Sequence, residues 1–303
     1  MNVAIIGYGT QGKKRYKELI NRKINIYIID PYFHHTNYKK LSDLNKNIEY
    51  AFVCTPDNKK YQIIKYLINK NIKILVEKPL YFETFSKYKN ILKLLNKYNF
   101  SKLYVAYNHR FEPNIIRLKK YLNQKKIGDI YLIEMYYGNG TSLLWKKSLW
   151  RSKEKKGVIY DLAPHLLDIY LYLFGNLPKK SFFFNKSKFE NKCIDYAEFG
   201  LVDRNKTIKF STSLIDWKNK FYINIIGSKG SLHVESLCKW SDSIFKYRKR
   251  VVPSGVPIEK IFIEKKNDPT WKLEHNYFFN NLKYSNFEND ILIKKYIDNL
   301  FNE

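Results

Sequence analysis

Short apolar runs alternate with stretches of helical period through the first hundred residues. This alternation is typical of strand–helix–strand units and predicts a parallel sheet. The expected strands are residues 3–6, 24–29, 50–54, 72–76 and 103–106. The expected helices between them are residues 12–21, 58–69 and 83–98. Asn71 follows the second helix, where a left-handed residue is often needed and asparagine tolerates that conformation.

The pattern changes from about residue 114. A basic helix to residue 126, a strand at 130–137 and one strongly apolar helix at 160–174 are expected. Paired strand patterns then follow at 196–202 with 208–214, and at 222–226 with 231–235 across a Gly-Ser-Lys-Gly turn. Residues 240–268 have no clear pattern, and a helical region at 271–301 closes the chain. Hairpins indicate an antiparallel sheet and hence a separate domain.

We therefore predict an α/β protein with two domains. Residues 1–122 form a doubly wound parallel sheet. Residues 123–303 form an α+β domain with an open, mainly antiparallel sheet. A chain of 303 residues that is 45% hydrophobic and 27% charged is large enough to bury two such cores.

Several sequence features that the chain lacks bear on its compartment and on metal binding. No apolar run approaches the roughly 20 residues that span a bilayer, and the first residues read as a strand rather than a signal peptide. The cysteines Cys54, Cys193 and Cys238 are widely spaced, without a CxxC pair. We therefore expect a cytoplasmic protein without a membrane partner, disulfide framework or metal site.

The formal net charge of +27 has two interpretations. Dense Lys and Arg can neutralise the phosphates of a nucleic acid. The excess is mostly Lys, however, and it accompanies heavy use of Asn, Ile, Tyr and Phe along the whole chain, as AT-rich coding produces. We favour this compositional origin and expect no nucleic-acid partner. A positive field could still attract an acidic or phosphorylated substrate, such as a sugar nucleotide or uronic acid.

A complete GxGxxG motif follows the first strand and opens a helix. Its residues are Gly7, Tyr8, Gly9, Thr10, Gln11 and Gly12. In this context the first glycine permits a tight turn, the second admits a pyrophosphate and the third allows close helix–strand packing. The helix N-terminus then faces the phosphate charge. The motif predicts a dinucleotide site of the Rossmann type.

Asp30 ends the second strand, 23 residues after Gly7. An acidic side chain there accepts hydrogen bonds from the ribose hydroxyls of the adenosine and repels a 2′-phosphate. We therefore expect NAD(H) to be preferred and NADP(H) to be possible, since Lys13 and Lys14 are nearby. Asp30 followed by Pro31 is also an ordinary turn signal.

Several further motifs occur in a fixed order. They are VCTPDN, VEKPL, YNHRFEP, an LWR before a glycine, and GVIYDLAPHLLD. With the glycine motif, they resemble the Gfo/Idh/MocA family, named for glucose-fructose oxidoreductase, inositol dehydrogenase and a rhizopine-catabolism protein. The resemblance implies that Thr55, Pro56 and Asn58 border the nicotinamide half of the cofactor, and that Glu77 and Pro79 place Lys78 beside the reacting carbon. A lysine there can stabilise an alkoxide as a hydride leaves, or polarise a ketone in reverse.

Asp161 and His165 are four residues apart, so they share one face of the expected apolar helix, and Asp168 continues that stripe. Polar groups on such a helix need partners, because burying them unpaired is costly. The resemblance implies that His165 is the acid/base, which takes the hydroxyl proton during oxidation, and that Asp161 orients the imidazole or binds a neighbouring hydroxyl. A satisfied core histidine is the structural alternative.

Aromatic and forked polar side chains form the family's substrate-facing wall. The matching residues are Tyr107, Asn108, Arg110, Phe111, Trp150 and Arg151. Such groups suit a sugar ring with carboxylate or phosphate substituents. Surface arginines and a packed tryptophan would look the same in sequence.

Together these features favour an NAD(P)-dependent oxidoreductase. It would transfer a hydride between nicotinamide and a hydroxyl or ketone of a sugar, cyclitol or nucleotide-linked sugar, in surface-polysaccharide biosynthesis by family analogy. The alternative is a non-catalytic dinucleotide-binding sensor of the same fold. A sensor need not retain Lys78, Asp161 and His165 together, as this chain does. The open sheet offers a face for association, so we expect a homodimer or homotetramer.

Overall fold

The structure is a computed structural model that describes residues 1–147, 156–202, 204–283 and 285–302. Contacts group the chain into two compact units. Unit 1 holds Met1–Asn108 and Trp271–Ile291, and unit 2 holds His109–Thr270 and Leu292–Glu303. The domain boundary expected after residue 122 stays a prediction.

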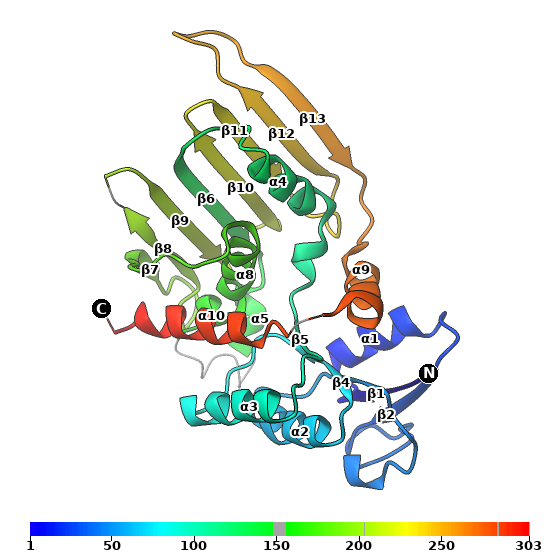
Figure 1. Ribbon diagram of the computed structural model, residues 1–303. Helices are drawn as coiled ribbons and strands as arrows, with labels where there is room; N and C mark the ends of the chain where they lie inside the picture. Colours follow the sequence, from blue (N-terminus) through cyan, green and yellow to red (C-terminus); the bar gives the residue numbers. More distant parts are fainter. Residues whose placement is uncertain (148–155, 203, 284, 303) are drawn as a thin grey trace. The chain divides into compact units, whose positions relative to one another are not determined.

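Unit 1 contains a five-stranded parallel sheet in the order β2-β1-β3-β4-β5 (Figure 1). Its strands are β1 (Asn2–Ile6), β2 (Asn25–Ile29), β3 (Tyr50–Val53), β4 (Lys73–Glu77) and β5 (Leu103–Ala106). Its helices are α1 (Thr10–Leu19), α2 (Asp57–Asn69) and α3 (Phe85–Lys97), with a 3-10 turn η1 (Leu41–Asp43). The predicted doubly wound sheet is confirmed, and Asn71 has the expected left-handed backbone, with φ of 56°.

The amphipathic pattern explains how these helices pack. On α2, Ile64, Leu67 and Ile68 are spaced three and four residues apart and are buried, so one face of the helix meets the sheet. Ala51, Phe52 and Val53 are successive residues of β3 and are all fully buried, as expected for a parallel strand covered on both faces.

A segment near the C-terminus, Trp271–Ile291, completes unit 1. The segments are α9 (Thr270–Asn276), a π-helical turn η3 (Tyr277–Asn281) and α10 (Phe287–Asn299), whose first residues belong to unit 1. Phe278 is fully buried, and its ring centroid lies 5.5 Å from that of Phe52 on β3. Asn286 accepts the backbone N–H of Val105 and donates to its carbonyl, at 2.7 and 2.9 Å. Unit 1 is therefore built from two stretches that are far apart in the sequence.

Unit 2 contains an eight-stranded sheet in the order β13-β12-β11-β10-β6-β9-β8-β7. The strands are β6 (Ile130–Gly138), β7 (Phe182–Ser187), β8 (Tyr196–Val202), β9 (Thr207–Ser213), β10 (Lys220–Gly227), β11 (Gly230–Glu235), β12 (Ser243–Lys249) and β13 (Ile258–Glu264). Among the described strands of this sheet, only β6 and β9 pair in parallel. The mainly antiparallel sheet is confirmed. Residues 240–268, which carried no clear pattern, supply the hairpin β12–β13.

Helices cover one face of this sheet (Figure 1). They include α4 (Pro113–Asn123), which contacts β11 and β12, and α8 (Ala163–Phe174), which contacts β6 and β9. Among the described residues, further short helices are η2 (Asn108–Phe111), α5 (Ser142–Lys147) and α7 (Val158–Asp161). Within the described residues, no helix is both long and apolar enough to cross a membrane.

The apolar helix expected at 160–174 is interrupted at Leu162, between α7 and α8. The reason is Pro164, which has no N–H to donate to the carbonyl of Tyr160. Gly157 precedes α7 with φ of 48°, and a Cβ at this position would lie 2.0 Å from the carbonyl oxygen of Ile194. Asp161 and His165 therefore lie on consecutive short helices rather than on one.

Candidate functional site

The glycine turn lies at the carboxyl edge of the parallel sheet in unit 1. Gly7 has φ of 91°, which permits the tight turn after β1, and a Cβ on Gly12 would lie 2.1 Å from the carbonyl oxygen of Gly7. A Cβ on Gly9, in contrast, would meet nothing within 4 Å. The turn thus leaves no room for a side chain where helix and strand pack, but it leaves open space at the N-terminus of α1.

Other predicted cofactor residues share this edge of unit 1. Thr55 and Pro56 follow β3, Asn58 lies in the first turn of α2, and Glu77 ends β4. The hydroxyl oxygen of Thr55 is buried and has no hydrogen-bond partner among the described residues. An open helix N-terminus beside an unsatisfied hydroxyl fits the phosphate and polar groups of a dinucleotide, so unit 1 can hold the expected cofactor.

Asp30 ties the glycine turn to the segment after β2. Its carboxylate accepts the backbone N–H of Tyr8 at 2.7 Å, and those of Tyr32 and Phe33 at 2.8 and 3.1 Å. Burial raises the pKa of Asp30, but these three donors outweigh it and hold the pKa below its ordinary value. Asp30 is therefore ionised at neutral pH, as ribose recognition requires. Its role in binding ribose stays a prediction.

Lys78 follows β4 and is half-buried. The buried ammonium of Lys60 on α2 donates to the carbonyl oxygens of Glu77, at 2.6 Å, and Pro79, at 3.0 Å. It also donates to Asp57 at 2.6 Å. The backbone on both sides of Lys78 is therefore held by one cation. We did not predict a role for Lys60, because a lysine on a helix in a basic chain reads as a solvated side chain.

A fully buried arginine lies behind the glycine turn. The Arg15 guanidinium donates to Glu77 at 2.7 Å and to Glu274 on α9 at 2.6 Å, and it lies 4.4 Å from the ring centroid of Trp271. Burial lowers the pKa of Arg15, but the two carboxylates more than offset this and raise it. Arg15 therefore links α1, the residue before Lys78, and the end of the chain.

His275 completes this buried cluster, and its Nε2 lies 2.9 Å from Arg15. Because Arg15 can only donate, Nε2 is the acceptor and the ring is neutral. Burial, followed by the charges of Arg15 and Arg22, lowers the pKa of His275 to about 2. This depressed value makes the unit sensitive to acid.

We expect the free energy of unfolding to fall between pH 7 and pH 5 by about 2 kcal/mol more in the wild type than in His275→Gln. The sign follows from linkage: below the ordinary pKa of 6.5 the unfolded imidazole binds a proton that the folded one refuses. The glutamine oxygen still accepts from Arg15. Urea denaturation of both proteins at several pH values measures this difference, and identical pH dependence would contradict it.

In unit 2, His165 on α8 lies in an aromatic and basic cluster. Its ring stacks on that of His109 at 4.2 Å and 26°, and Tyr137 on β6 lies 5.6 Å away. The ammonium of Lys239, in the loop after β11, lies 3.1 Å from Nε2 of His109 and 3.2 Å from the hydroxyl of Tyr137. We call His109, Tyr137, His165 and Lys239 the imidazole cluster. Sequence analysis predicted only His165 of the four.

Arg110 and Asp168 form a pair beside this cluster. Nε of Arg110 donates to Oδ2 of Asp168 at 2.6 Å, and its second nitrogen donates to Oδ1. Burial raises the pKa of Asp168, and Arg110 lowers it in part. Of the polar stripe, Asp168 is thus satisfied by an ion pair, and substrate contact by Arg110 stays a prediction.

Three further residues were predicted from the sequence to contact the substrate. Asn108 closes the first segment of unit 1. Trp150 and Arg151 lie outside the described residues. Contact between these side chains and a substrate stays a prediction.

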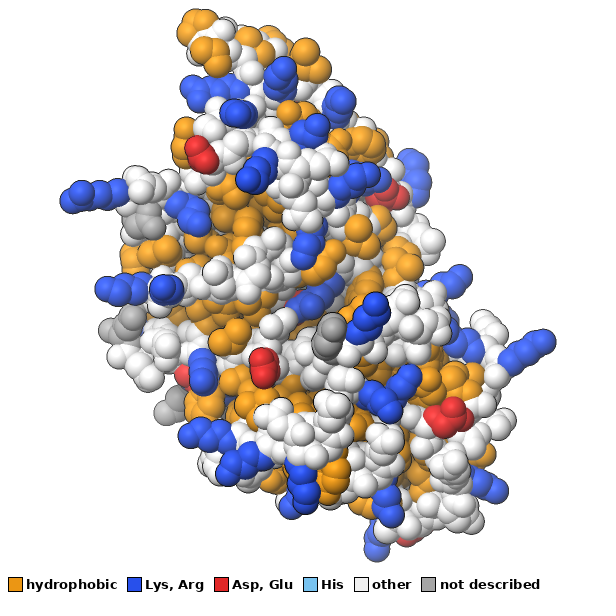
Figure 2. All heavy atoms as spheres, viewed as in Figure 1, with side chains coloured by type: hydrophobic (Ala, Val, Ile, Leu, Met, Phe, Trp, Pro, Cys, Tyr) orange, Lys and Arg blue, Asp and Glu red, His pale blue; other side chains and the backbone are white. Residues whose placement is uncertain are grey.

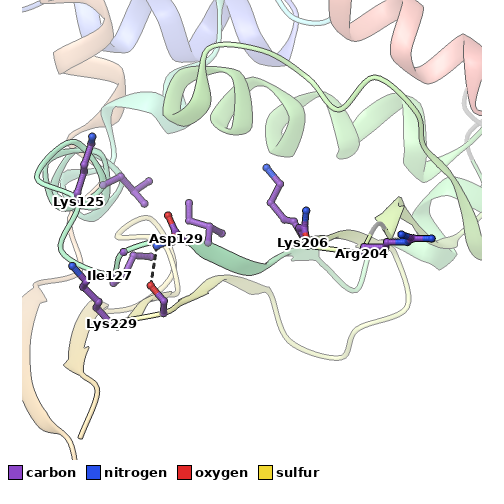
Figure 3. Close-up of a pocket in the computed structure, with 11 residues that line it drawn as sticks. Lys125, Ile127, Asp129, Arg204, Lys206 and Lys229 are labelled. Carbon is purple, nitrogen blue, oxygen red and sulfur yellow. Dashed lines mark hydrogen bonds between the residues drawn. The ribbon is translucent and has the colours of Figure 1, made fainter. Parts of the chain in front are cut away.

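Figure 3 shows a separate hollow of about 890 Å³ at one end of the sheet in unit 2. Lys125 and Lys229 lie on one side of Asp129, and Arg204 and Lys206 on the other. Lys125 follows the C-terminus of α4, where cations stabilise the helix dipole. Among the predicted site residues that the structure describes, none lines this hollow. On the face shown in Figure 2, the Lys and Arg side chains are scattered over the surface rather than gathered in one patch.

The fold and the glycine turn define a dinucleotide-binding protein with a second, mixed-sheet unit. Two models of one family match in succession: an oxidoreductase family with an NAD-binding Rossmann fold over residues 1–107, and the GFO/IDH/MocA C-terminal domain over residues 115–233. The chain belongs to the Gfo/Idh/MocA family. The predicted oxidoreductase class and nicotinamide cofactor are thereby confirmed at the level of the family.

Curated relatives cover the chain only in part. An uncharacterized oxidoreductase of Schizosaccharomyces pombe is 28% identical over 142 residues, which are 46% of this chain and 37% of that protein. Glucose-6-phosphate 3-dehydrogenase of Bacillus subtilis is 24% identical over 241 residues, 68% of this chain and 64% of the relative. The chain thus spans less than two thirds of the length of both relatives.

Solved structures share the fold over the whole chain. An oxidoreductase from Agrobacterium radiobacter, solved with NAD+, L-tartaric acid and magnesium, has a TM-score of 0.79 at 15% identity and covers 100% of this chain and 96% of its own. An oxidoreductase from Bacillus cereus has a TM-score of 0.77 at 20% identity, with coverage of 100% and 96%. At such identities the likeness supports the fold alone.

Proposed function

We propose that the protein is an NAD-preferring dehydrogenase or reductase of a small polyhydroxylated substrate, a sugar, cyclitol or nucleotide-linked sugar. The observation that carries the proposal is family membership across both units with Lys78, Asp161 and His165 retained at the motif positions. A dinucleotide-binding sensor would not need all three. The names of relatives, glucose-6-phosphate 3-dehydrogenase and inositol 2-dehydrogenase, favour this substrate class.

In the direction of oxidation, the substrate loses a hydride from carbon and a proton from the hydroxyl, and a C=O bond forms. Bound nicotinamide supplies the hydride acceptor. His165 would take the proton, while the ammonium of Lys78 would stabilise the alkoxide as charge develops. Lys60 would hold the backbone of Lys78 in place, and Asp161 would bind a neighbouring hydroxyl. We expect a cytoplasmic homo-oligomer that serves surface-polysaccharide biosynthesis.

The test is nicotinamide absorbance at 340 nm with a panel of sugars, cyclitols and sugar nucleotides, each offered with NAD+ and NADP+. We expect at least one substrate to be turned over, with kcat/KM at least tenfold higher for NAD+. Asp30→Ala should narrow that preference, because the repulsion of a 2′-phosphate is lost. Dinucleotide binding without reduction of the cofactor by any substrate would instead favour the sensor.

A further inference from the structure

Lys239 is held in a defined place by its neighbours in the chain. The backbone N–H of Cys238 donates to the buried carboxylate of Glu112 at 3.0 Å, and the carbonyl of Cys238 accepts from Asn267 at 3.1 Å. Trp240 closes a turn onto Leu237 at 2.9 Å. The loop after β11 therefore presents Lys239 from a fixed backbone. A fixed cation of this kind differs from the many solvated lysines of the chain.

The ammonium of Lys239 is surrounded by neutral partners. It lies 3.1 Å from the imidazole nitrogen of His109, 3.2 Å from the hydroxyl of Tyr137 and 4.4 Å from the ring centroid of Trp240. Across the described residues, no carboxylate lies within ion-pair distance of it. Asp268, Glu112 and Asp161 act on it only at longer range.

A cation removed from water without a counter-ion is unfavourable. Burial accordingly lowers the pKa of Lys239 to about 8, although Asp268, Glu112 and Asp161 each raise it. Lys239 and Asp161 both keep some exposure, so the ammonium is not sealed off from solvent. An anion that arrived there would supply the missing counter-charge.

The cation also lies close to the predicted acid/base. His109 contacts Lys239 on one side and stacks on His165 at 4.2 Å. A substrate whose hydroxyl reached His165 could therefore place a substituent near Lys239. We infer that Lys239 is a specificity-determining residue, which binds the carboxylate or phosphate group of an anionic sugar beside His165. This inference rests on the proposed function.

A set of three matched ligands tests it. D-glucose, D-glucuronate and D-glucose 6-phosphate, with inorganic phosphate as a bare anion, are titrated into the NADH-loaded protein, and calorimetry and tryptophan fluorescence measure the dissociation constants. We expect at least one of the anions to bind at least tenfold more tightly than glucose. Lys239→Met should lower the affinity for that anion at least tenfold and the affinity for glucose less than threefold. Lys239→Arg should retain the preference for the anion.

The pH dependence separates ligand contact from a structural role. Anion binding requires the protonated amine, so the affinity should fall as pH rises from 7 through 8 to 9 in the wild type. It should stay level in Lys239→Arg, whose guanidinium keeps its charge. His109, Tyr137, Asp161, Glu112 and Asp268 face the ammonium and are unchanged in that variant.

Three results would overturn the inference. In the first, neither phosphate nor either charged sugar binds in a way that depends on Lys239. The second is an equal loss of glucose and anion affinity in Lys239→Met. The third is an unfolded Lys239→Met together with a Lys239→Arg that has no anion preference. The proposed function is tested apart from this, by nicotinamide reduction in the wild type, so a failure of one does not look like a failure of the other.

Discussion

Lys78→Met should lose turnover by roughly 10³-fold while its affinity for NAD+ stays within about threefold of the wild type. The methionine keeps the length of the side chain but removes the charge that would stabilise the alkoxide. The backbone is still held by Lys60 through the carbonyls of Glu77 and Pro79, so the site should keep its shape. Steady-state kinetics at 340 nm and calorimetric titration of NAD+ measure the two quantities.

Lys65→Met is the matched control for this experiment, because Lys65 is exposed on α2. The Lys65→Met protein should turn over substrate at the rate of the wild type. A Lys78→Met protein with turnover within tenfold of the wild type would remove the charge of Lys78 from the mechanism. A fall in NAD+ affinity that matched the fall in turnover would instead assign Lys78 to cofactor binding.

Arg15→Met should lower the free energy of unfolding by about 3–5 kcal/mol. The substitution leaves Glu274, which is fully buried, and Glu77, which is nearly so, without their cation. This is the largest effect on stability that we expect from one side chain in unit 1. Urea denaturation at pH 7 measures it.

Two further proteins make this prediction specific. Arg22→Met removes an arginine that donates one hydrogen bond, to Asn276 at 2.8 Å, and should lower the stability by about 1 kcal/mol. Arg15→Met combined with Glu274→Met should recover part of the loss, since one uncompensated carboxylate is gone. A double variant no more stable than Arg15→Met alone would show that the two side chains are not coupled.

Local pattern was enough to predict the sheet of unit 1. Its strands are continuous apolar runs, and the glycine motif reports contacts between residues only a few positions apart, such as Gly7 and Gly12. The pairing of strands that lie far apart in the sequence could not be predicted from local pattern. Residues 240–268 read as basic and irregular because β13 is exposed along most of its length, so no buried face imposes an alternation on it.

The sequence predicted those residues of the candidate site that lie in recognisable motifs. Lys78, Asp161 and His165 lie in such motifs. Lys60, Arg15 and Lys239 do not, and each is a cation in a chain with 55 lysines and arginines. What sets them apart is burial and a particular set of acceptors, and both arise only when distant segments meet. A pattern along the sequence has no way to distinguish a buried cation from a solvated one.

Unit 1 is assembled from the first 108 residues and from residues 271–291. Arg15 is made early in translation, whereas Glu274 and His275 leave the ribosome only after the whole of the second sheet. Unit 1 is thus the first to be started, and it is still incomplete when the last strand of the second sheet has been made. A chain that stops before residue 274 lacks the carboxylate of Glu274, so Arg15 then has only Glu77 of its two ion-pair partners.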